Sequence, residues 1–490
     1  MASPSTATPP ATSSARFPPQ IPFLIGNEAC ERFSFYGMRN ILTVFLIDYL
    51  LRNAVPDEGA RSAQAKSLMH LFMAGVYFFP LLGGYLADRW LGKYKVILSL
   101  SLVYCLGHAC LAVFENNATG FYAGLVLISL GSGGIKPCVS AMVGDQFNES
   151  NKHLVKKVFA IFYWTINFGS FFASLTIPLT LKHYGPAVAF GIPGILMFIA
   201  TVVFWAGRHH YVRVPPTGPN PHSFLKVVGS ALRHRGQGSH WLDGATREHP
   251  AEAVEGAKAV LRISALLLPT IPFFWMLFDQ KASTWVIQAR AMDPQVGPVT
   301  FQPSQMQFIN PALVMLLIPL LVGVVYPAFQ RSGWELTPLR RMPLGLAVGA
   351  LSYAIAGYYQ VVIERGTTLN IAWQLLPYIV LTLSEVLVST TGLEFAYTQA
   401  PREMKGIMQS IWLLTSSLAN VAVAIAAALN VFTGSGQFFF YGGLALLAAV
   451  GMALMARKFE VRDYYQLDTT GPVPDRAQPP LATMGGKKAL

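Results

Sequence analysis

Glu28, Glu31 and Arg32 are ionisable residues inside an apolar stretch, Ile21 to Leu51, that is long enough to cross a lipid bilayer. Each such group costs roughly 2.5–3.5 kcal/mol in hydrocarbon, so a helix keeps it only where neighbours satisfy it or where it has a function. Their i, i+3, i+4 spacing places all three on one helix face, which continues with Phe35, Tyr36 and Arg39. The pattern predicts that this helix lines a polar cavity; the alternative is a static ion pair that locks helix packing.

The composition places these charges in a membrane protein. Of the 490 residues, 53% are hydrophobic and 12% are charged, whereas soluble domains carry about 25% charged residues. Apolar segments of about 20 residues recur twelve times, and the longest gap, Arg208 to Leu261, separates six spans from six. The formal net charge of +12 is attributed to basic loops that set membrane topology, so we expect no nucleic-acid partner.

These features predict an all-α membrane protein with twelve transmembrane helices in two six-helix halves. The polar N-terminal stretch has no apolar signal region, so we expect a disordered tail. Apolar residues at helical spacing among basic ones predict a helix on the membrane surface at Ser223 to Arg235. The predicted domains are a cytoplasmic N-terminal tail (1–20), an N-terminal bundle (21–208), a cytoplasmic linker (209–261), a C-terminal bundle (262–457) and a cytoplasmic C-terminal tail (458–490).

The distribution of lysine and arginine predicts the orientation. These residues are frequent in the loops after the second, fourth, eighth and tenth spans and scarcer in most of the alternate loops. The loop after the first span is an exception, because it contains Arg52 and Arg61. Because basic loops stay in the cytoplasm, we expect a multi-pass protein of the plasma or inner membrane with both termini inside the cell.

The polar residues within the spans differ between the two halves. The first half supplies the cations Arg32, Arg39 and Lys136. The second half supplies the anions Asp279 and Glu385. A ligand with a carboxylate at one end and an ammonium at the other suits such a cavity, and amino acids and short peptides are ligands of this kind. Further polar or aromatic side chains within the spans are His70, Tyr77, Asn167, Trp275, Asn310, Ser389 and Trp412.

A buried carboxylate beside an arginine can exchange a proton when the arginine engages a ligand, so proton coupling is a second hypothesis. Other interpretations of the same residues stay open. His70 is also explained as a hydrogen-bonded core histidine. Lys136 precedes Pro137 and could satisfy carbonyls freed by a proline kink. Trp275 and Trp412 could be interfacial anchors or core residues.

Several motifs together resemble the proton-coupled oligopeptide transporter family of the major facilitator superfamily. They occur in the same order as in that family and cover nearly all of 20–460. The motifs are the ExxER pattern in Glu28–Gly37, the loop Gly84–Lys93, Gly134–Pro137 with Asp145–Phe147, Phe162–Ser170, Phe274–Gln280, Gln305–Pro311 and Gly392–Pro401. The sequence departs from many members at Phe35, where they carry a second tyrosine, and at Asp279, where many bacterial relatives carry glutamate. The linker is also too polar for the two extra helices of many bacterial members.

The resemblance implies a role for each matching residue. Proton coupling is implied for Glu28, Glu31, Arg32, His70 and Lys136. Arg39 and Lys136, with Arg32, are implied to receive the peptide carboxylate, and Glu385 the amino terminus. The implied substrate-binding residues are Arg39, Lys136, Tyr36, Tyr77, Asn167, Trp275, Asn310, Glu385, Ser389 and Trp412. Two gate pairs are implied, Arg39 with Asp279 on the outside and Lys136 with Glu385 on the inside.

The resemblance therefore implies a proton-coupled symporter that imports di- and tripeptides by alternating access, with a functional monomer in the lipid bilayer. The alternative within the same family is the transport of nitrate or another small anion. Glu385 disfavours that alternative, because an inorganic anion has no ammonium for this carboxylate to bind. The sequence contains no HExxH motif or Cys–His pairing, so we expect neither an enzyme nor a metal site. We also expect no cofactor, because a proton gradient supplies the driving force.

Overall fold

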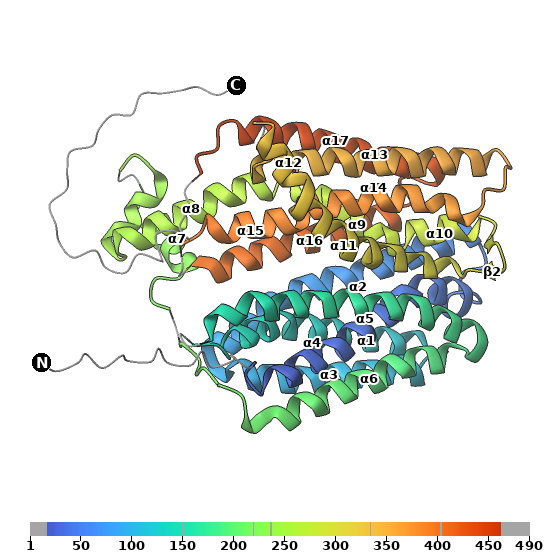
Figure 1. Ribbon diagram of the computed structural model, residues 1–490, viewed down its shortest axis with the longest axis horizontal. Helices are drawn as coiled ribbons and strands as arrows, with labels where there is room; N and C mark the ends of the chain where they lie inside the picture. Colours follow the sequence, from blue (N-terminus) through green and yellow to red (C-terminus); the bar gives the residue numbers. More distant parts are fainter. Residues whose placement is uncertain are drawn as a thin grey trace, which may run out of the picture.

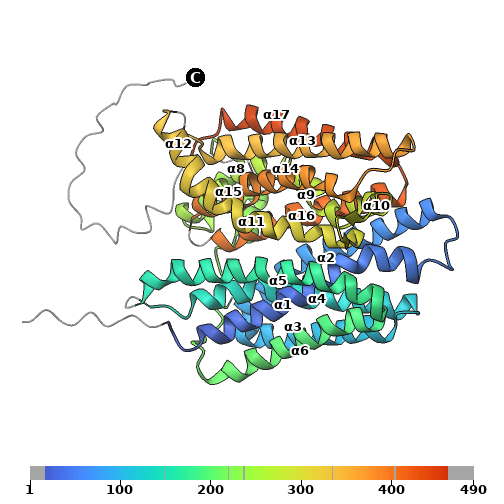
Figure 2. The same ribbon diagram turned by 45° about the vertical axis from the view of Figure 1, so that its right-hand side comes forward.

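The chain forms two bundles of long helices that lie side by side in both views (Figures 1 and 2). The computed structural model describes residues 17–148, 151–218, 220–235, 238–333, 335–401 and 404–461. Residues 1–16 of the expected N-terminal tail and residues 462–490 of the expected C-terminal tail lie outside the described residues.

The N-terminal bundle contains the first six long helices and a core of apolar side chains that they share. Asp57 and Asn117 cap α2 and α4 by accepting hydrogen bonds from the backbone, at 2.6 and 2.9 Å. Gly92 and Gly185 adopt positive φ angles and turn the chain into α3 and α6. The helices are α1 (Ile21–Phe45), α2 (Glu58–Leu86), α3 (Lys93–Val113), α4 (Ala118–Gly144), α5 (Val155–Tyr184) and α6 (Pro186–Ala206), with short helical turns η1 (Leu46–Leu50), η2 (Ala87–Leu91), η3 (Lys152–Leu154) and η4 (Gly207–His209).

The C-terminal bundle has a second apolar core and more interrupted helices. It consists of α8 (Ala251–Leu267), α9 (Ile271–Asp279), α10 (Thr284–Arg290), α11 (Ile309–Leu320), α12 (Tyr326–Arg331), α13 (Pro338–Glu364), α14 (Leu375–Glu385), α15 (Thr391–Thr398), α16 (Lys405–Ala428) and α17 (Gly434–Ala456). Short helical segments η6 (Gln280–Ala282), η7 (Pro303–Phe308), η8 (Leu321–Val325), η9 (Ile371–Gln374) and η10 (Val386–Thr390) join or extend them. A small antiparallel hairpin, β1 (Gln295–Val296) and β2 (Val299–Thr300), follows α10.

The described residues include ten helices that are long and apolar enough to cross a membrane, and an eleventh span if a bent pair is taken as one. The bent pair joins α8 to the segment Ile271–Arg290 at an angle of 51°. The charges at Glu28, Glu31, Arg32 and Arg39 make α1 too polar to be recognised by composition alone. With α1 added, the structure agrees with a twelve-helix membrane protein.

The linker is shorter than the sequence analysis expected. Helix α8 begins at Ala251, inside the range 209–261 expected to connect the bundles. The polar residues Glu252, Glu255 and Lys258 hid this start, because they lie on a helical extension beyond the apolar part of the span. Helix α7 (Phe224–Arg233) forms within the expected segment. Its buried apolar residues pack on η5 (Trp241–Arg247) and α8, while Leu225 and Leu232 are exposed, so its place on a membrane surface stays a prediction. Figure 1 shows α7 and the start of α8 beyond one end of the bundles.

Candidate substrate cavity and gates

A cavity of about 590 Å³ lies between the two bundles. Residues from the starts of α1, α5 and α16 (Asn27, Phe159 and Gln409) line part of it, so it extends toward the end of the molecule that carries the linker. The other lining residues discussed below are Glu28, Glu31, Arg32, Tyr36, Tyr77, Lys136, Asn167, Trp275, Glu385, Ser389 and Trp412.

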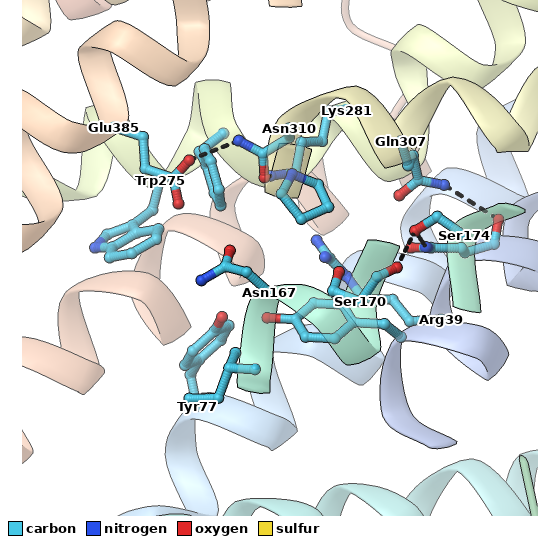
Figure 3. Close-up of a pocket in the computed structure, with 15 residues that line it drawn as sticks. Arg39, Tyr77, Asn167, Ser170, Ser174, Trp275, Lys281, Gln307, Asn310 and Glu385 are labelled. Carbon is cyan, nitrogen blue, oxygen red and sulfur yellow. Dashed lines mark hydrogen bonds between the residues drawn. The ribbon is translucent and has the colours of Figure 1, made fainter. Parts of the chain in front are cut away.

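A smaller cavity of about 150 Å³ adjoins the first one (Figure 3). The two share Tyr36, Tyr77, Asn167, Trp275 and Glu385 in their walls. The smaller cavity adds Arg39, Asn310 and residues that the sequence analysis did not single out, Asn40, Ser170, Ser174, Lys281 and Gln307. The structure therefore brings together every substrate-binding candidate named from the sequence.

The acidic residues of the first helix share one guanidinium. Nε of Arg32 lies 3.2 Å from Oε1 of Glu28 and also contacts Glu31. All three side chains are buried, with residue exposures of 7% or less. One guanidinium therefore contacts both carboxylates. This geometry agrees with the shared face expected from the spacing of these residues.

Lys136 is placed by a close approach of α2 and α4. A Cβ atom on Gly83 would come 2.0 Å from the carbonyl oxygen of Gly134, so the two helices meet at glycine backbone. The lysine Nζ lies 4.5 Å from the centre of the Tyr77 ring, a cation–π contact. Lys136 and Glu385 line the same cavity, but no ion pair joins them among the described contacts. The inner pair implied by the resemblance is thus not formed in this conformation.

Arg39 and Asp279 connect the two bundles on the far side of this cavity. Their salt bridge is 3.1 Å long, and both side chains are buried. The other carboxylate oxygen of Asp279 accepts hydrogen bonds from Asn420 at 2.7 Å and from Ser416 at 3.4 Å. Removing one partner of a buried ion pair costs about 3–5 kcal/mol, because the charge of the other partner is then left buried without compensation.

His70 belongs to the same network. Its Nδ1 lies 2.7 Å from Oδ1 of Asn420, and its Nε2 lies 2.8 Å from Oγ of Ser283. Because Asn420 donates its NH₂ group to Asp279, its Oδ1 must accept, and Nδ1 of His70 therefore carries a hydrogen. His70 is thus a fully hydrogen-bonded histidine that is also one amide away from the Asp279 carboxylate, so its geometry is compatible with both interpretations of its role.

Several more contacts close the end of the molecule beyond Arg39. Thr43 donates to the carbonyl of Ala282 at 2.7 Å, and Arg290 pairs with Asp48 at 2.5 Å. Gln307 donates to the carbonyl of Asn40 at 3.2 Å. All these contacts cross between the bundles, so the structure is closed at this end and hollow toward the linker end.

Glu385 lies at the end of α14, where the helix widens into the turn η10. Its Oε2 accepts a hydrogen bond from Asn310 at 2.6 Å, and Asn310 in turn accepts one from Lys281 at 2.6 Å. Trp275 and Trp412 meet edge to face with ring centres 6.2 Å apart. Both tryptophans are buried, which contradicts the alternative that they are interfacial anchors.

Lys281 and Asn420 are two of the polar residues near the site that the sequence analysis missed. Lys281 lies two residues after Asp279 and is 4% exposed. The cost of an ionisable residue at membrane depth would have identified it, as it identified Glu28. Asn420 is a neutral residue in the apolar helix α16, and no signal in its sequence neighbourhood points to His70 or Asp279.

Two bundles of membrane-spanning helices around a charged central cavity have the architecture of a membrane transporter of the major facilitator type. A sequence model described as "PTR2: POT family" matches residues 94–437. The chain therefore belongs to the POT family.

Relatives and solved structures agree with this assignment. Peptide transporter 3 of Caenorhabditis elegans is 38% identical over 372 residues, which is 71% of this chain and 52% of the relative. Solute carrier family 15 member 2 of Mus musculus is 38% identical over 384 residues, 74% of this chain and 51% of the relative. The chain thus spans about half the length of these curated relatives. The crystal structure of the POT family transporter PepTSo superposes with a TM-score of 0.86 and 48% identity, over 92% of this chain and 100% of that one.

Proposed function

We propose that this protein imports di- and tripeptides together with protons by alternating access of its two bundles. The observation that carries the proposal is a pair of adjoining cavities with Arg32, Arg39 and Lys136 on one bundle and the partly buried carboxylate of Glu385 on the other. A peptide has one carboxylate and one ammonium whatever its side chains are. Charge-assisted hydrogen bonds to these two groups give affinity that does not depend on the peptide sequence.

In this proposal the peptide carboxylate binds Arg39 and Lys136, with Arg32 nearby, and the ammonium binds Glu385. Asn167 and Asn310 supply further hydrogen bonds at the ammonium end. The remaining wall receives the peptide side chains through Tyr36, Tyr77, Trp275, Ser389 and Trp412. Aromatic walls offer a large contact area without demanding one side-chain shape, which suits a carrier of many peptides.

The proton is proposed to bind at the carboxylates that share Arg32. When Glu28 or Glu31 takes a proton, the remaining carboxylate alone pairs with Arg32, and the cavity gains one positive charge. The gain favours the peptide carboxylate, so proton and peptide bind together. His70 is proposed to contribute a second proton-sensitive group, through Asn420, at the Arg39–Asp279 pair.

Alternating access is proposed to use two gate pairs. Arg39 and Asp279 close the outer end, as in the present conformation. Lys136 and Glu385 approach each other when the inner end closes. Each pair crosses between the bundles, so opening one end and closing the other exchanges one set of contacts for another.

The proposal places the protein in the cell membrane with both termini in the cytoplasm, as a functional monomer that needs no cofactor beyond the proton gradient. The anion-transport alternative lacks support, since Glu385 would have no group to bind on nitrate. Its partly buried carboxylate would instead repel an anion in the cavity.

Uptake of labelled dialanine into proteoliposomes tests the proposal. We expect accumulation when the outside is more acidic than the lumen and only slow equilibration without the gradient. Equal uptake with and without the gradient would refute proton coupling. No uptake or binding of dialanine by folded protein would refute peptide transport itself.

A further inference from the structure

Lys281 is a buried cation that the proposed mechanism does not use. Its Nζ donates to Oδ1 of Asn310 at 2.6 Å and lies 3.3 Å from the centre of the Phe278 ring. The side chain points into the smaller cavity (Figure 3). A short hydrogen bond and a cation–π contact stabilise the ammonium at a depth where an unpaired charge is expensive.

Asn310 connects Lys281 to Glu385. Its Oδ1 accepts from Lys281, while its NH₂ group donates to Glu385 at 2.6 Å and to Thr382 at 3.1 Å. These partners fix the orientation of the amide, because only the oxygen can accept and only the nitrogen can donate. In this conformation, therefore, the carboxylate proposed to bind the substrate ammonium is linked through one amide to a cation of the protein.

A substrate ammonium at Glu385 changes this balance. It places a second positive charge beside Lys281, and like charges repel strongly where water is scarce. The other acidic residue that interacts electrostatically with Lys281 is Asp279, which lies two residues earlier at the junction of α9 and η6. Asp279 is also the partner of Arg39 in the salt bridge between the bundles.

We propose that Lys281 couples occupation of the ammonium site to the outer gate. In the empty carrier Lys281 is held toward Glu385 through Asn310. A bound substrate ammonium displaces it toward Asp279, where it competes with Arg39 and weakens the contact that closes the outer end. The inference rests on the proposed peptide function, since it needs a substrate with an ammonium group.

The first experiment separates binding from turnover in the full-length protein. Lys281→Met removes the charge and keeps the side-chain length, Lys281→Gln is a second neutral variant, and Lys281→Arg keeps the charge. We expect dialanine to bind roughly 3- to 10-fold more tightly to the neutral variants, since a competitor for Glu385 is gone, while turnover in proteoliposomes falls by about 10-fold or more. N-acetyl-dialanine, which has no ammonium, should show no gain in affinity. Lys182→Met, at an exposed position of α5, is the matched control for loss of a cation.

The second experiment follows the outer gate directly. Spin labels at Asn53→Cys and Thr368→Cys report the separation of the bundles, because both positions are exposed in loops at the closed end. The four native cysteines are first replaced by serine or alanine. We expect dialanine at acidic pH to lengthen the label-to-label distance in the Lys281 and Lys281→Arg proteins, but not in the neutral variants.

The outcomes distinguish this inference from the proposed function. Two outcomes would refute the coupling of the ammonium site to the outer gate by Lys281. In the first, dialanine still lengthens the label-to-label distance in Lys281→Met and Lys281→Gln; in the second, these neutral variants lose affinity and turnover in parallel. In both cases the proposal of peptide transport would stand. If the protein with native Lys281 neither binds nor transports dialanine, the proposed function fails and this inference fails with it.

Discussion

The charge of Glu385 can be removed with almost no change of shape by Glu385→Gln. The glutamine carbonyl oxygen still accepts the hydrogen bond that Asn310 donates at 2.6 Å, so the local packing is retained. A hydrogen bond to a charged group contributes about 1.5–3 kcal/mol and a neutral one about 0.5–1.5 kcal/mol. The difference, about 1–1.5 kcal/mol, predicts that dialanine binds roughly 5- to 10-fold more weakly, since 1.4 kcal/mol is a factor of ten.

The assay compares two ligands in detergent-solubilised and reconstituted protein. Dialanine has an ammonium group and N-acetyl-dialanine does not, so only the affinity for dialanine should fall in Glu385→Gln. Glu394→Gln is the matched control, because Glu394 is an exposed acidic residue that follows in α15. An equal loss for both ligands, or no loss for dialanine, would refute the assignment of the ammonium to Glu385.

Two further predictions concern the hydrogen bonds around the proposed outer gate pair and the helix packing that supports Lys136. Asn420→Leu removes the amide between His70 and Asp279. We therefore expect the pH of half-maximal proton-driven uptake to shift, while the affinity for dialanine at one acidic pH stays within about threefold of the native value. An unchanged pH profile of uptake would contradict the proposed coupling of His70 to Asp279 through Asn420. Gly83→Leu would place side-chain atoms where the α4 backbone lies at the α2–α4 contact, so we expect a lower Tm and less monodisperse protein. Gly84→Ala is the control: its Cβ meets no atom within 4 Å, so this variant should behave like the native protein.

The sequence predicted the cavity because charges at membrane depth are too costly to be incidental. The spacing of Glu28, Glu31 and Arg32 predicts one face of a regular helix, and in the structure Arg32 contacts both carboxylates there. The same cost argument identified Lys136 and Glu385 in other spans. These residues come from separate helices, and only the interior of the bundle can provide polar partners for their charges.

Other features depend on packing that no local pattern carries. Asn420 acts through its position across from His70, which is 350 residues away in the sequence. The start of α8 was missed since an amphipathic, charged turn before a span looks like a loop when only apolar length is considered. The sequence could not predict the conformation either. It contains the residues of both proposed gate pairs, but only three-dimensional contacts show that Arg39 is paired with Asp279 and that Lys136 is not paired with Glu385.

The charges around the cavity explain why the proton and the peptide belong together in the proposed cycle. Among the described residues that line the two cavities or form an ion pair with a lining residue, four acidic side chains face four basic ones: Glu28, Glu31, Asp279 and Glu385 against Arg32, Arg39, Lys136 and Lys281. A peptide alone adds one charge of each sign, but its carboxylate then competes with the acids that already hold Arg32 and Arg39. A proton on one of the two acids at Arg32 removes that competition. Lys281, displaced by the peptide ammonium, can take the place of Arg39 at Asp279, so that Arg39 and Lys136 are both free for the peptide carboxylate. The loaded site then carries one net positive charge, which is that of the proton.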